Sequence, residues 1–354
     1  MEFRSYSHME NEYRILNSKV VQEILSDNSL EFVALEKIHG TNFSFITDGI
    51  EVQCCRRSDV LQPDESFFNW QNTLNKYKSN IIKLFELVKE KLSLDIIQIQ
   101  LYGELYGGNY PGVEKINGHK TIQKGIYYSN SNEFAGFDLK YFIKSDSNIE
   151  NCENEDICEN LELYEKYLNW DLFEQVIMEV SIGIVPVIYR GKWNDLNKLN
   201  PKFESEVYKL HGLPKIHNNW AEGFVIKPIR EIYLKKDQER LIWKFKNPSF
   251  LEIVKTGNEK DKLDKEQNIH QNPLLYKLER YVCENRYDNV VAKVIEGVTS
   301  DKVVELFYLD VWVDFIDDLV LDGFVLTDTD KKECEKKLRG LANKFVRTRY
   351  LIKK

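Results

Sequence analysis

The chain has 354 residues, of which 42% are hydrophobic and 12% are aromatic, and its formal net charge is -8 at pH 7. This length favours two domains, and the negative charge argues against nonspecific nucleic-acid binding by the whole surface. No apolar run approaches the roughly 18 residues that a membrane span requires, and residues 1–13 are too polar for a signal peptide. We therefore expect no membrane association and an intracellular, cytoplasmic location, with a viral or organellar origin left open.

In chain order, the first informative segment is residues 36–42, Glu-Lys-Ile-His-Gly-Thr-Asn, which directly follows the apolar run 32–35. It places Lys37 beside a glycine turn in a chain that has no Walker-type phosphate loop. A lysine attacks phosphorus only as the free amine, so it needs a desolvated pocket or cationic neighbours, and a close backbone to receive phosphate. An exposed lysine at a strand end is the commoner explanation of such a segment taken alone. Lys37 is the candidate nucleophile if other segments supply its neighbours.

Helical and strand-like patterns follow this segment. Apolar residues at helical spacing predict an amphipathic helix over 72–92. Short strand-like runs surround it, at 43–46, 96–102, 134–139, 184–188, 223–227 and 241–245. Residues 146–160 are acidic and poor in large apolar side chains, which is typical of a surface insertion, and a second polar stretch covers 255–273. Because the pattern beyond it is helical, we place a domain boundary near residue 250.

The C-terminal part is predicted to be all-helical, because 274–294, 303–321 and 331–350 each carry apolar residues at helical spacing. From Lys331 to Lys354 there are ten Lys or Arg residues and two Glu residues. Such a charge run is either a solvated helix face or a surface that follows the phosphates of a nucleic acid.

Cysteine spacing argues against structural metal or covalent cross-links. The six cysteines contain no CxxC pair, and the close pair Cys152 and Cys158 has no neighbouring ligand-type histidine. We therefore predict neither a zinc site nor a disulfide.

Two lysines share one face of the last strand-like run. Alternation over residues 241–246 places Lys244 and Lys246 on one face and Trp243 and Phe245 on the other. Lysines on an edge strand can simply deter aggregation. Alternatively, they form a phosphate clamp, which would stabilise charge on a transferring phosphoryl group and favour the neutral amine of Lys37 by like-charge repulsion.

Residues 222–228 add a carboxylate, a glycine and another lysine around an apolar strand. Glu222 is a candidate metal ligand. Glu222 and Lys227 are five residues apart, so strict alternation sends them to opposite faces unless Glu222 sits on a bend that Gly223 permits. Parity therefore supports one of the two at a common site, but not both unaided.

Two further strands end in residues that suit nucleotide binding. Glu104 ends an apolar strand and precedes a turn-rich loop, where it could hold a ribose hydroxyl or be an ordinary loop carboxylate. Phe137 lies in another short strand, where an aromatic ring could stack on a base or belong to the core.

These segments, in this order, resemble the covalent nucleotidyltransferase superfamily, and specifically the bacteriophage-type RNA ligase 2 family, which also includes the kinetoplastid RNA-editing ligases. The most specific element is residues 36–44, because DNA ligases and capping enzymes characteristically carry Asp where this chain has His39. The resemblance implies an α+β fold. Residues 1–250 would form an adenylyltransferase domain of ATP-grasp-like antiparallel sheets with helices, and residues 251–354 a small all-α domain that binds RNA ends.

The resemblance also implies the roles of individual residues. Lys37 would form the lysyl-adenylate, Glu104 would bind ribose, Phe137 would stack on adenine, and Glu222 would help to hold the metal. The remaining nucleotide contacts would come from Glu36, Ile38, His39, Asn42, Arg57, Lys227, Lys244 and Lys246, of which the last two would also act in catalysis. Ser58 and Asp59 follow the arginine where Thr-Gly is expected, which leaves Arg56 and Arg57 as alternatives.

The implied activity is ATP-dependent joining of RNA ends that carry a 5′-phosphate and a 3′-hydroxyl, at nicks in duplex RNA, by a monomer that uses Mg²⁺ or Mn²⁺. GTP-dependent capping uses the same lysine chemistry, but His39 and the helical C-terminal part argue against it. The third alternative is a nucleotide-binding or RNA-binding scaffold without catalysis, against which the presence of Lys37, Glu222, Lys244 and Lys246 argues.

Overall fold

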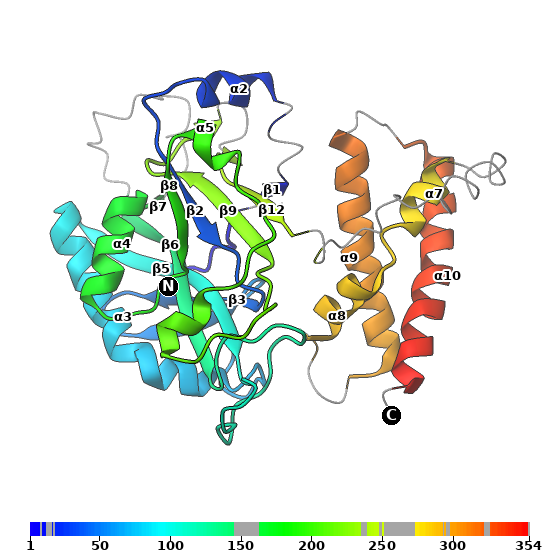
Figure 1. The fold of residues 1–354 in the computed structure, drawn as a ribbon, viewed down its shortest axis with the longest axis horizontal. Coiled ribbons are helices and arrows are strands. Elements are labelled where there is room, and N and C mark those ends of the chain that lie inside the picture. The colour runs from blue at the N-terminus through cyan, green and yellow to red at the C-terminus, as the bar shows by residue number, and fades with distance from the viewer. Residues whose placement is uncertain are drawn as a thin grey trace. The chain divides into compact units, whose positions relative to one another are not determined.

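The computed structural model describes residues 1–7, 9–11, 16, 18–144, 163–234, 239–247, 250, 273–292, 294, 298–321 and 326–352. Two compact units, Met1–Asn247 and Pro248–Lys354, make up the chain (Figure 1). The acidic stretch 146–160, Cys152 and Cys158 with it, and the polar stretch 255–273 up to residue 272 lie outside the described residues.

The first unit contains two five-stranded sheets. The sheet that carries the Lys37 segment has the order β1-β12-β9-β2-β8. Its strands are β1 (Glu10–Asn11), β2 (Phe32–Glu36), β8 (Val187–Gly191), β9 (Gly223–Pro228) and β12 (Trp243–Lys246). All its neighbouring strands are antiparallel except β1 and β12, which run parallel. One face of this sheet is closed by an apolar cluster that includes Phe32, Phe224 and Trp243.

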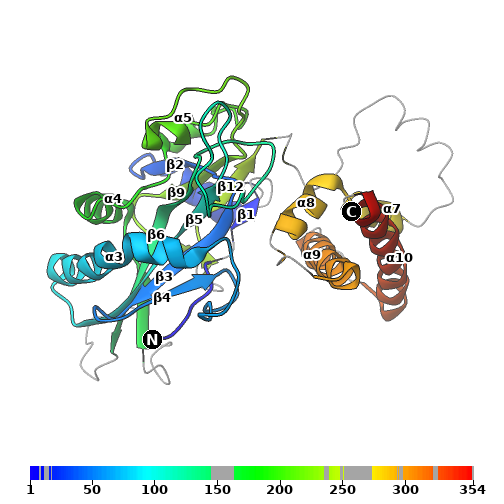
Figure 2. The same ribbon diagram turned by 90° about the horizontal axis from the view of Figure 1, so that it is seen from below.

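The second sheet has the order β4-β3-β5-β6-β7 and is antiparallel throughout. Its strands are β3 (Thr41–Thr47), β4 (Val52–Arg56), β5 (Ile96–Gly107), β6 (Asn132–Lys144) and β7 (Leu163–Tyr167). The helices α3 (Trp70–Leu92) and α4 (Trp170–Glu179) pack together against this sheet (Figure 2). Tyr77, Ile81, Phe85 and Val88 are buried on α3, as the periodicity over 72–92 predicts.

Short elements complete the first unit. They are α2 (Lys19–Leu25), α5 (Trp193–Leu196), the 3₁₀ helix η2 (Val207–His211), and the hairpin of β10 (Tyr233–Leu234) and β11 (Glu239–Arg240). The strand-like run at 184–188 is displaced in the structure, because the observed strand β8 begins only at Val187, while Ile184 forms an isolated bridge to Gly136.

The described part of the second unit is helical. Its helices are α7 (Pro273–Glu279), α8 (Glu284–Ala292), α9 (Ser300–Leu321) and α10 (Asp328–Ile352). The segment 274–294 is therefore two helices and not one, because the helical hydrogen bonding stops at residues 280–283. Phe307, Val311, Phe315, Leu338 and Ala342 lie in the common core of α9 and α10.

The expected α+β class is confirmed, with antiparallel sheets and helices in the first unit and helices alone in the described residues of the second. None of the described helices is both long and apolar enough to cross a bilayer.

Candidate active site

A pocket that opens to solvent lies between the two sheets. Leu35, Val225 and Lys227 line it from the first sheet. Asn42, Glu104 and Phe137 line it from the second. Lys37 and Ile38, which connect β2 to the turn before β3, also belong to the lining, so the candidate nucleophile faces this pocket.

Glu222 is the centre of the charged group at the pocket. Its Oε2 accepts a hydrogen bond of 2.7 Å from Lys37 Nζ and lies 3.3 Å from His39 Nδ1. Its Oε1 lies 3.6 Å from Lys246 Nζ. Burial alone would raise the pKa of Glu222, but the charge of Lys37, the hydrogen bond with His39 and the charge of Lys246 hold it well below its usual value. Glu222 is therefore an anion in a largely buried position.

The backbone before β9 explains how Glu222 and Lys227 serve the same pocket. Gly223 has φ of +142°, a conformation that L side chains rarely adopt, and a Cβ there would lie 1.9 Å from the carbonyl oxygen of Phe245. The chain therefore bends at Gly223, and the alternation of β9 starts only after Glu222. Lys227 lines the pocket from β9, while Glu222 reaches Lys37 from the bend. Strand alternation alone supports only one of these two residues at a common site, and the structure brings both there.

The turn after Lys37 is closely packed. A Cβ on Gly40 would lie 2.3 Å from the carbonyl oxygen of Leu105, so this position requires glycine. The N–H of Gly40 donates to Glu104 Oε1 at 3.1 Å. Glu104 is only half-buried and lines the pocket, so its carboxylate both supports the turn and faces the space where a ligand would lie.

Phe137 belongs to an aromatic wall that includes the start of the chain. The rings of Phe137 and Tyr6 meet edge to face with centroids 4.9 Å apart, and Tyr6 and Met9 both line the pocket. Neither Tyr6 nor Met9 is indicated by a sequence pattern. Residues 1–11 are too short a segment to show a periodic pattern, and only their pairing with distant strands places them here.

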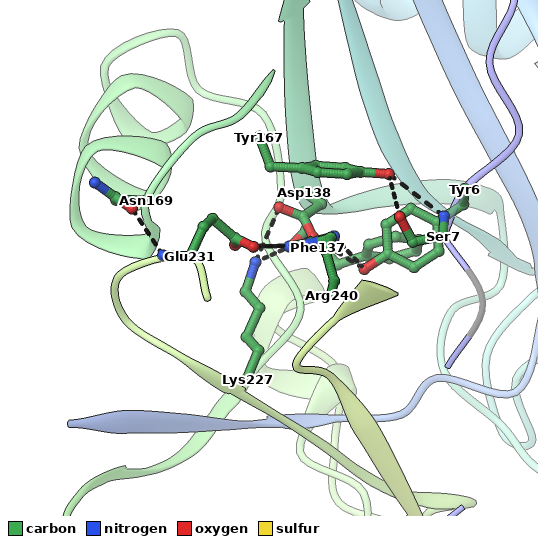
Figure 3. Close-up of polar contacts among 9 residues, drawn as sticks. All are labelled: Tyr6, Ser7, Phe137, Asp138, Tyr167, Asn169, Lys227, Glu231 and Arg240. Atoms are coloured by element: carbon green, nitrogen blue, oxygen red, sulfur yellow. Dashed lines mark hydrogen bonds and ion pairs between the residues drawn. The ribbon is translucent and has the colours of Figure 1, made fainter. Parts of the chain in front are cut away.

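A buried ionic network lies behind this wall (Figure 3). Asp138 Oδ1 accepts a hydrogen bond of 2.9 Å from Lys227, and Asp138 Oδ2 accepts bonds from Arg240 at 2.8 Å and Tyr6 at 2.9 Å. Arg240 also donates two bonds to Glu231, of 2.6 and 2.7 Å. Asp138 is fully buried, and burial alone would raise its pKa, but the charges of Arg240 and Lys227 lower it. The network fixes Lys227 and the β6 backbone at Phe137.

Lys244 and Lys246 lie on the strand that borders β9. Trp243 and Phe245 pack into the apolar cluster of the first sheet, as the predicted alternation requires. Lys246 reaches Glu222, and Lys244 stands opposite Val225, which lines the pocket.

Three other candidate residues are placed less directly. Glu36 borders the pocket, but its carboxylate accepts a hydrogen bond of 2.9 Å from the N–H of Glu206. Arg56 pairs with Asp59 and Glu65, at 2.5 and 3.0 Å. Arg57 is exposed and does not belong to the pocket lining. A nucleotide contact by either arginine stays a prediction.

Glu222 also limits the kind of metal binding that the site could support. Among the residues that the structure describes, no three His, Cys, Asp or Glu side chains converge on one metal position. Magnesium usually keeps several waters and binds through one or two carboxylates and the phosphates of a substrate. The buried carboxylate of Glu222 fits an ion that arrives with nucleotide phosphates.

Comparison with known proteins identifies the family. Residues 30–246 match the family model described as RNA ligase, and residues 265–344 match the one described as T4 RNA ligase 2 C-terminal. The mitochondrial RNA-editing ligase 2 of Trypanosoma brucei brucei is 25% identical over 338 residues, which cover 81% of this chain and 77% of that protein. The mitochondrial RNA-editing ligase 1 of the same organism is 27% identical over 259 residues, which cover 65% of this chain and 52% of that protein.

Solved structures of a Naegleria gruberi RNA ligase are also similar. An apo variant of that ligase is 14% identical with a TM-score of 0.42, and the match covers 70% of this chain and 57% of that one. The chain thus spans only part of these relatives. The first family model alone spans more than half of the sequence and contains Lys37, Glu104, Phe137, Glu222 and Lys246. The chain belongs to the RNA ligase family.

Proposed function

We propose that this protein is an ATP-dependent RNA ligase that joins a 3′-hydroxyl and a 5′-phosphate RNA end through a lysyl-AMP intermediate. The main support is the position of Lys37, which lines a pocket between the two sheets beside a buried carboxylate and Lys246. Such a lysine can attack phosphorus once it has lost its proton and its bond to Glu222.

Three displacements at phosphorus make up the proposed reaction. In the first, Lys37 Nζ forms a bond to the α-phosphorus of ATP, the bond to the bridging oxygen breaks, and pyrophosphate leaves. In the second, an oxygen of the RNA 5′-phosphate attacks the AMP phosphorus, and the P–N bond breaks to return the lysine. In the third, the RNA 3′-hydroxyl loses its proton and attacks the 5′-phosphorus, and AMP leaves. Magnesium, when bound, would neutralise phosphate charge.

Different pocket residues would contact the base, the ribose and the phosphates of the nucleotide. Phe137 would stack on the base and Glu104 would accept a hydrogen bond from the ribose, since both line the pocket from the second sheet. Ile38, Asn42 and Lys227 complete the lining around them. Lys246, with Lys244 on the same face of β12, would hold the phosphates as charge develops on them.

Label transfer tests the first step directly. ATP labelled at the α-phosphate should leave covalent label on the wild-type chain and none on Lys37→Ala. Lys209→Ala, which removes an exposed lysine outside the pocket, is the matched control and should label normally. No label on the wild type would contradict the proposal and would favour a scaffold. Label from GTP in preference to ATP would favour a capping enzyme.

The second unit is proposed to bind the RNA ends. Lys331, Lys332, Lys336 and Lys344 are exposed on α10. By contrast, Lys337, Arg347 and Arg349 pair with acidic residues of the same unit. Deleting α10 would also remove Leu338 and Ala342 from the core, so charge substitution is the cleaner test. Lys332→Glu with Lys336→Glu should weaken sealing of RNA and leave self-adenylylation unchanged, and equal loss of both would contradict this role.

Nicked duplex RNA is the proposed substrate and a monomer the proposed state. A panel of nicked duplexes with RNA or DNA on either side of the break, beside single-stranded ends, tests the first. Sealing of single strands at the rate of nicked duplex would reject this substrate.

Sedimentation of the purified chain at assay concentration tests the proposed monomer, and a dimer mass would reject it.

A further inference from the structure

The turn that follows Lys37 is held from two sides by different kinds of bond. On one side, Glu222 binds the side chains of Lys37 and His39. On the other side, the Tyr128 hydroxyl accepts a hydrogen bond of 2.8 Å from the backbone N–H of His39. The side-chain amide of Gln123 donates one of 3.1 Å to the carbonyl of Gly40. Tyr128 and Gln123 both belong to the loop 108–131 between β5 and β6.

Only one of these two sets of bonds has to change in the proposed reaction. Lys37 cannot keep its ammonium bond to Glu222 while it attacks phosphorus, so the side-chain bonds on that side must change. The bonds from Tyr128 and Gln123 involve only main-chain atoms of His39 and Gly40, and nothing in the reaction requires them to break. They are therefore available to keep the turn in place when Glu222 releases the lysine.

Tyr128 is itself held firmly. Its side chain is buried, and its ring meets Tyr106 edge to face with centroids 5.6 Å apart. Burial raises the pKa of its hydroxyl well above the usual value, so the group stays neutral across the working range of pH. A fixed neutral hydroxyl at 2.8 Å allows the His39 peptide little rotation.

We propose that Tyr128 is a positioning residue of the lysine adenylylation step, because its hydroxyl fixes the His39 peptide and so the direction of Lys37 at the moment when Glu222 lets the lysine go. This inference rests on the proposed function. It concerns the rate of the chemical step and not the affinity for ATP, since Tyr128 does not belong to the pocket lining.

The test compares Tyr128→Phe with Tyr127→Phe, which removes the same atom from the adjacent residue of the loop. Single-turnover labelling with α-labelled ATP is measured over a range of ATP concentrations. Tyr128→Phe should lower the maximal rate on the order of 10-fold, as expected for one lost hydrogen bond. The half-saturating ATP concentration should stay at the wild-type value, and Tyr127→Phe should match the wild type in both respects.

Two results would overturn the inference: a wild-type maximal rate for Tyr128→Phe, or a raised half-saturating concentration with no change in the maximal rate. Unlabelled wild type would instead overturn the proposed function, so the two failures are distinct. If Tyr128→Phe proves too unstable to assay, Gln123→Met supplies the second variant. It removes the donor to Gly40 from the same turn and should lower the maximal rate in the same way, and an unchanged rate would count against the inference.

Discussion

Lys37 and Glu222 form an ion pair of 2.7 Å although 185 positions separate them in the sequence. Their meeting depends on the pairing of β2 with β9 and on the bend at Gly223. In this arrangement the candidate nucleophile is an ammonium bound to a carboxylate. A cation that competes for Glu222 would release the lysine, which links the metal requirement to the state of the nucleophile.

Glu222→Gln should therefore weaken the apparent affinity for the magnesium that supports adenylylation. We expect the half-saturating Mg²⁺ concentration to rise on the order of 10- to 100-fold, as for the loss of other groups that support metal binding. Titration of the labelling rate with Mg²⁺ measures this. Glu179→Gln, on the exposed surface of α4, is the control. If the titration curve of Glu222→Gln overlaps that of the wild type, the role of Glu222 as a metal ligand is rejected.

Lys246→Ala and Lys244→Ala should slow self-adenylylation. A rate loss on the order of 10² to 10³ is expected for each if it stabilises charge on the phosphates in the transition state. Single-turnover labelling measures the effect, and Lys198→Ala, an exposed lysine of the loop after α5, serves as control. Unchanged labelling by both variants would reject the phosphate clamp.

Asp138→Asn should destabilise the first unit, because it leaves Lys227 and Arg240 buried without their shared counterion. Loss of one partner from a buried ion pair typically costs about 3–5 kcal/mol. The folded-state pKa of Asp138 is lowered, so its stabilising effect is complete above the unfolded value of about 3.9 and is lost as the pH falls below it. In urea unfolding, the difference in free energy of unfolding between variant and wild type should be smaller at acid pH than at neutral pH. A difference that does not change with pH would contradict this account.

Glu36→Gln should have the opposite pH dependence. Burial raises the pKa of Glu36 from 4.5 to about 7, and the opposing hydrogen bonds from Ser205 and Glu206 do not cancel it. Between these pH values the unfolded chain ionises before the folded one, so the wild type loses stability as the pH rises. The stability of Glu36→Gln relative to the wild type should therefore increase from acid to neutral pH, by up to about 3 kcal/mol. The same difference in free energy of unfolding between variant and wild type at both pH values would refute the prediction.

Gly40→Ala should abolish or strongly reduce labelling, because its Cβ would meet the backbone oxygen of Leu105 at 2.3 Å. Neither group can yield without moving the turn that carries Lys37. Gly340→Ala is the matched control, since that Cβ would meet no atom within 4 Å beyond the adjacent residues and backbone of its own helix, and alanine favours a helix by about 1 kcal/mol. It should raise the stability of the second unit and leave labelling intact. Normal labelling by Gly40→Ala would show that the turn is not constrained.

The sequence was informative where local patterns carry the structure. Alternation over 241–246 correctly separates Trp243 and Phe245 from the two lysines, and helical periodicity finds α3 and α10. It was not informative where the position of a residue depends on pairing between distant segments. Nothing local to Tyr6 indicates that its hydroxyl reaches Asp138, 132 residues away.

A charged residue at the start of an apolar run was an available signal for the buried network. Arg240 directly precedes the apolar residues Leu241 and Ile242, and in the structure it is almost completely buried beside Asp138. The break between α7 and α8 had no comparable signal, because apolar residues continue at helical spacing through it.

The pairing of β1 with β12 joins the beginning of the first unit to its end, since Glu10 stands beside Trp243 and Asn11 beside Lys244. A nascent chain can therefore complete the pocket only after residue 246 has left the ribosome. Folding must close nearly the whole length of the unit into one loop, which is slow compared with local helix formation. A truncated chain that stops before β12 would then lack Lys244, Lys246 and the strand that pairs with β1, so incomplete synthesis cannot leave a partly active enzyme.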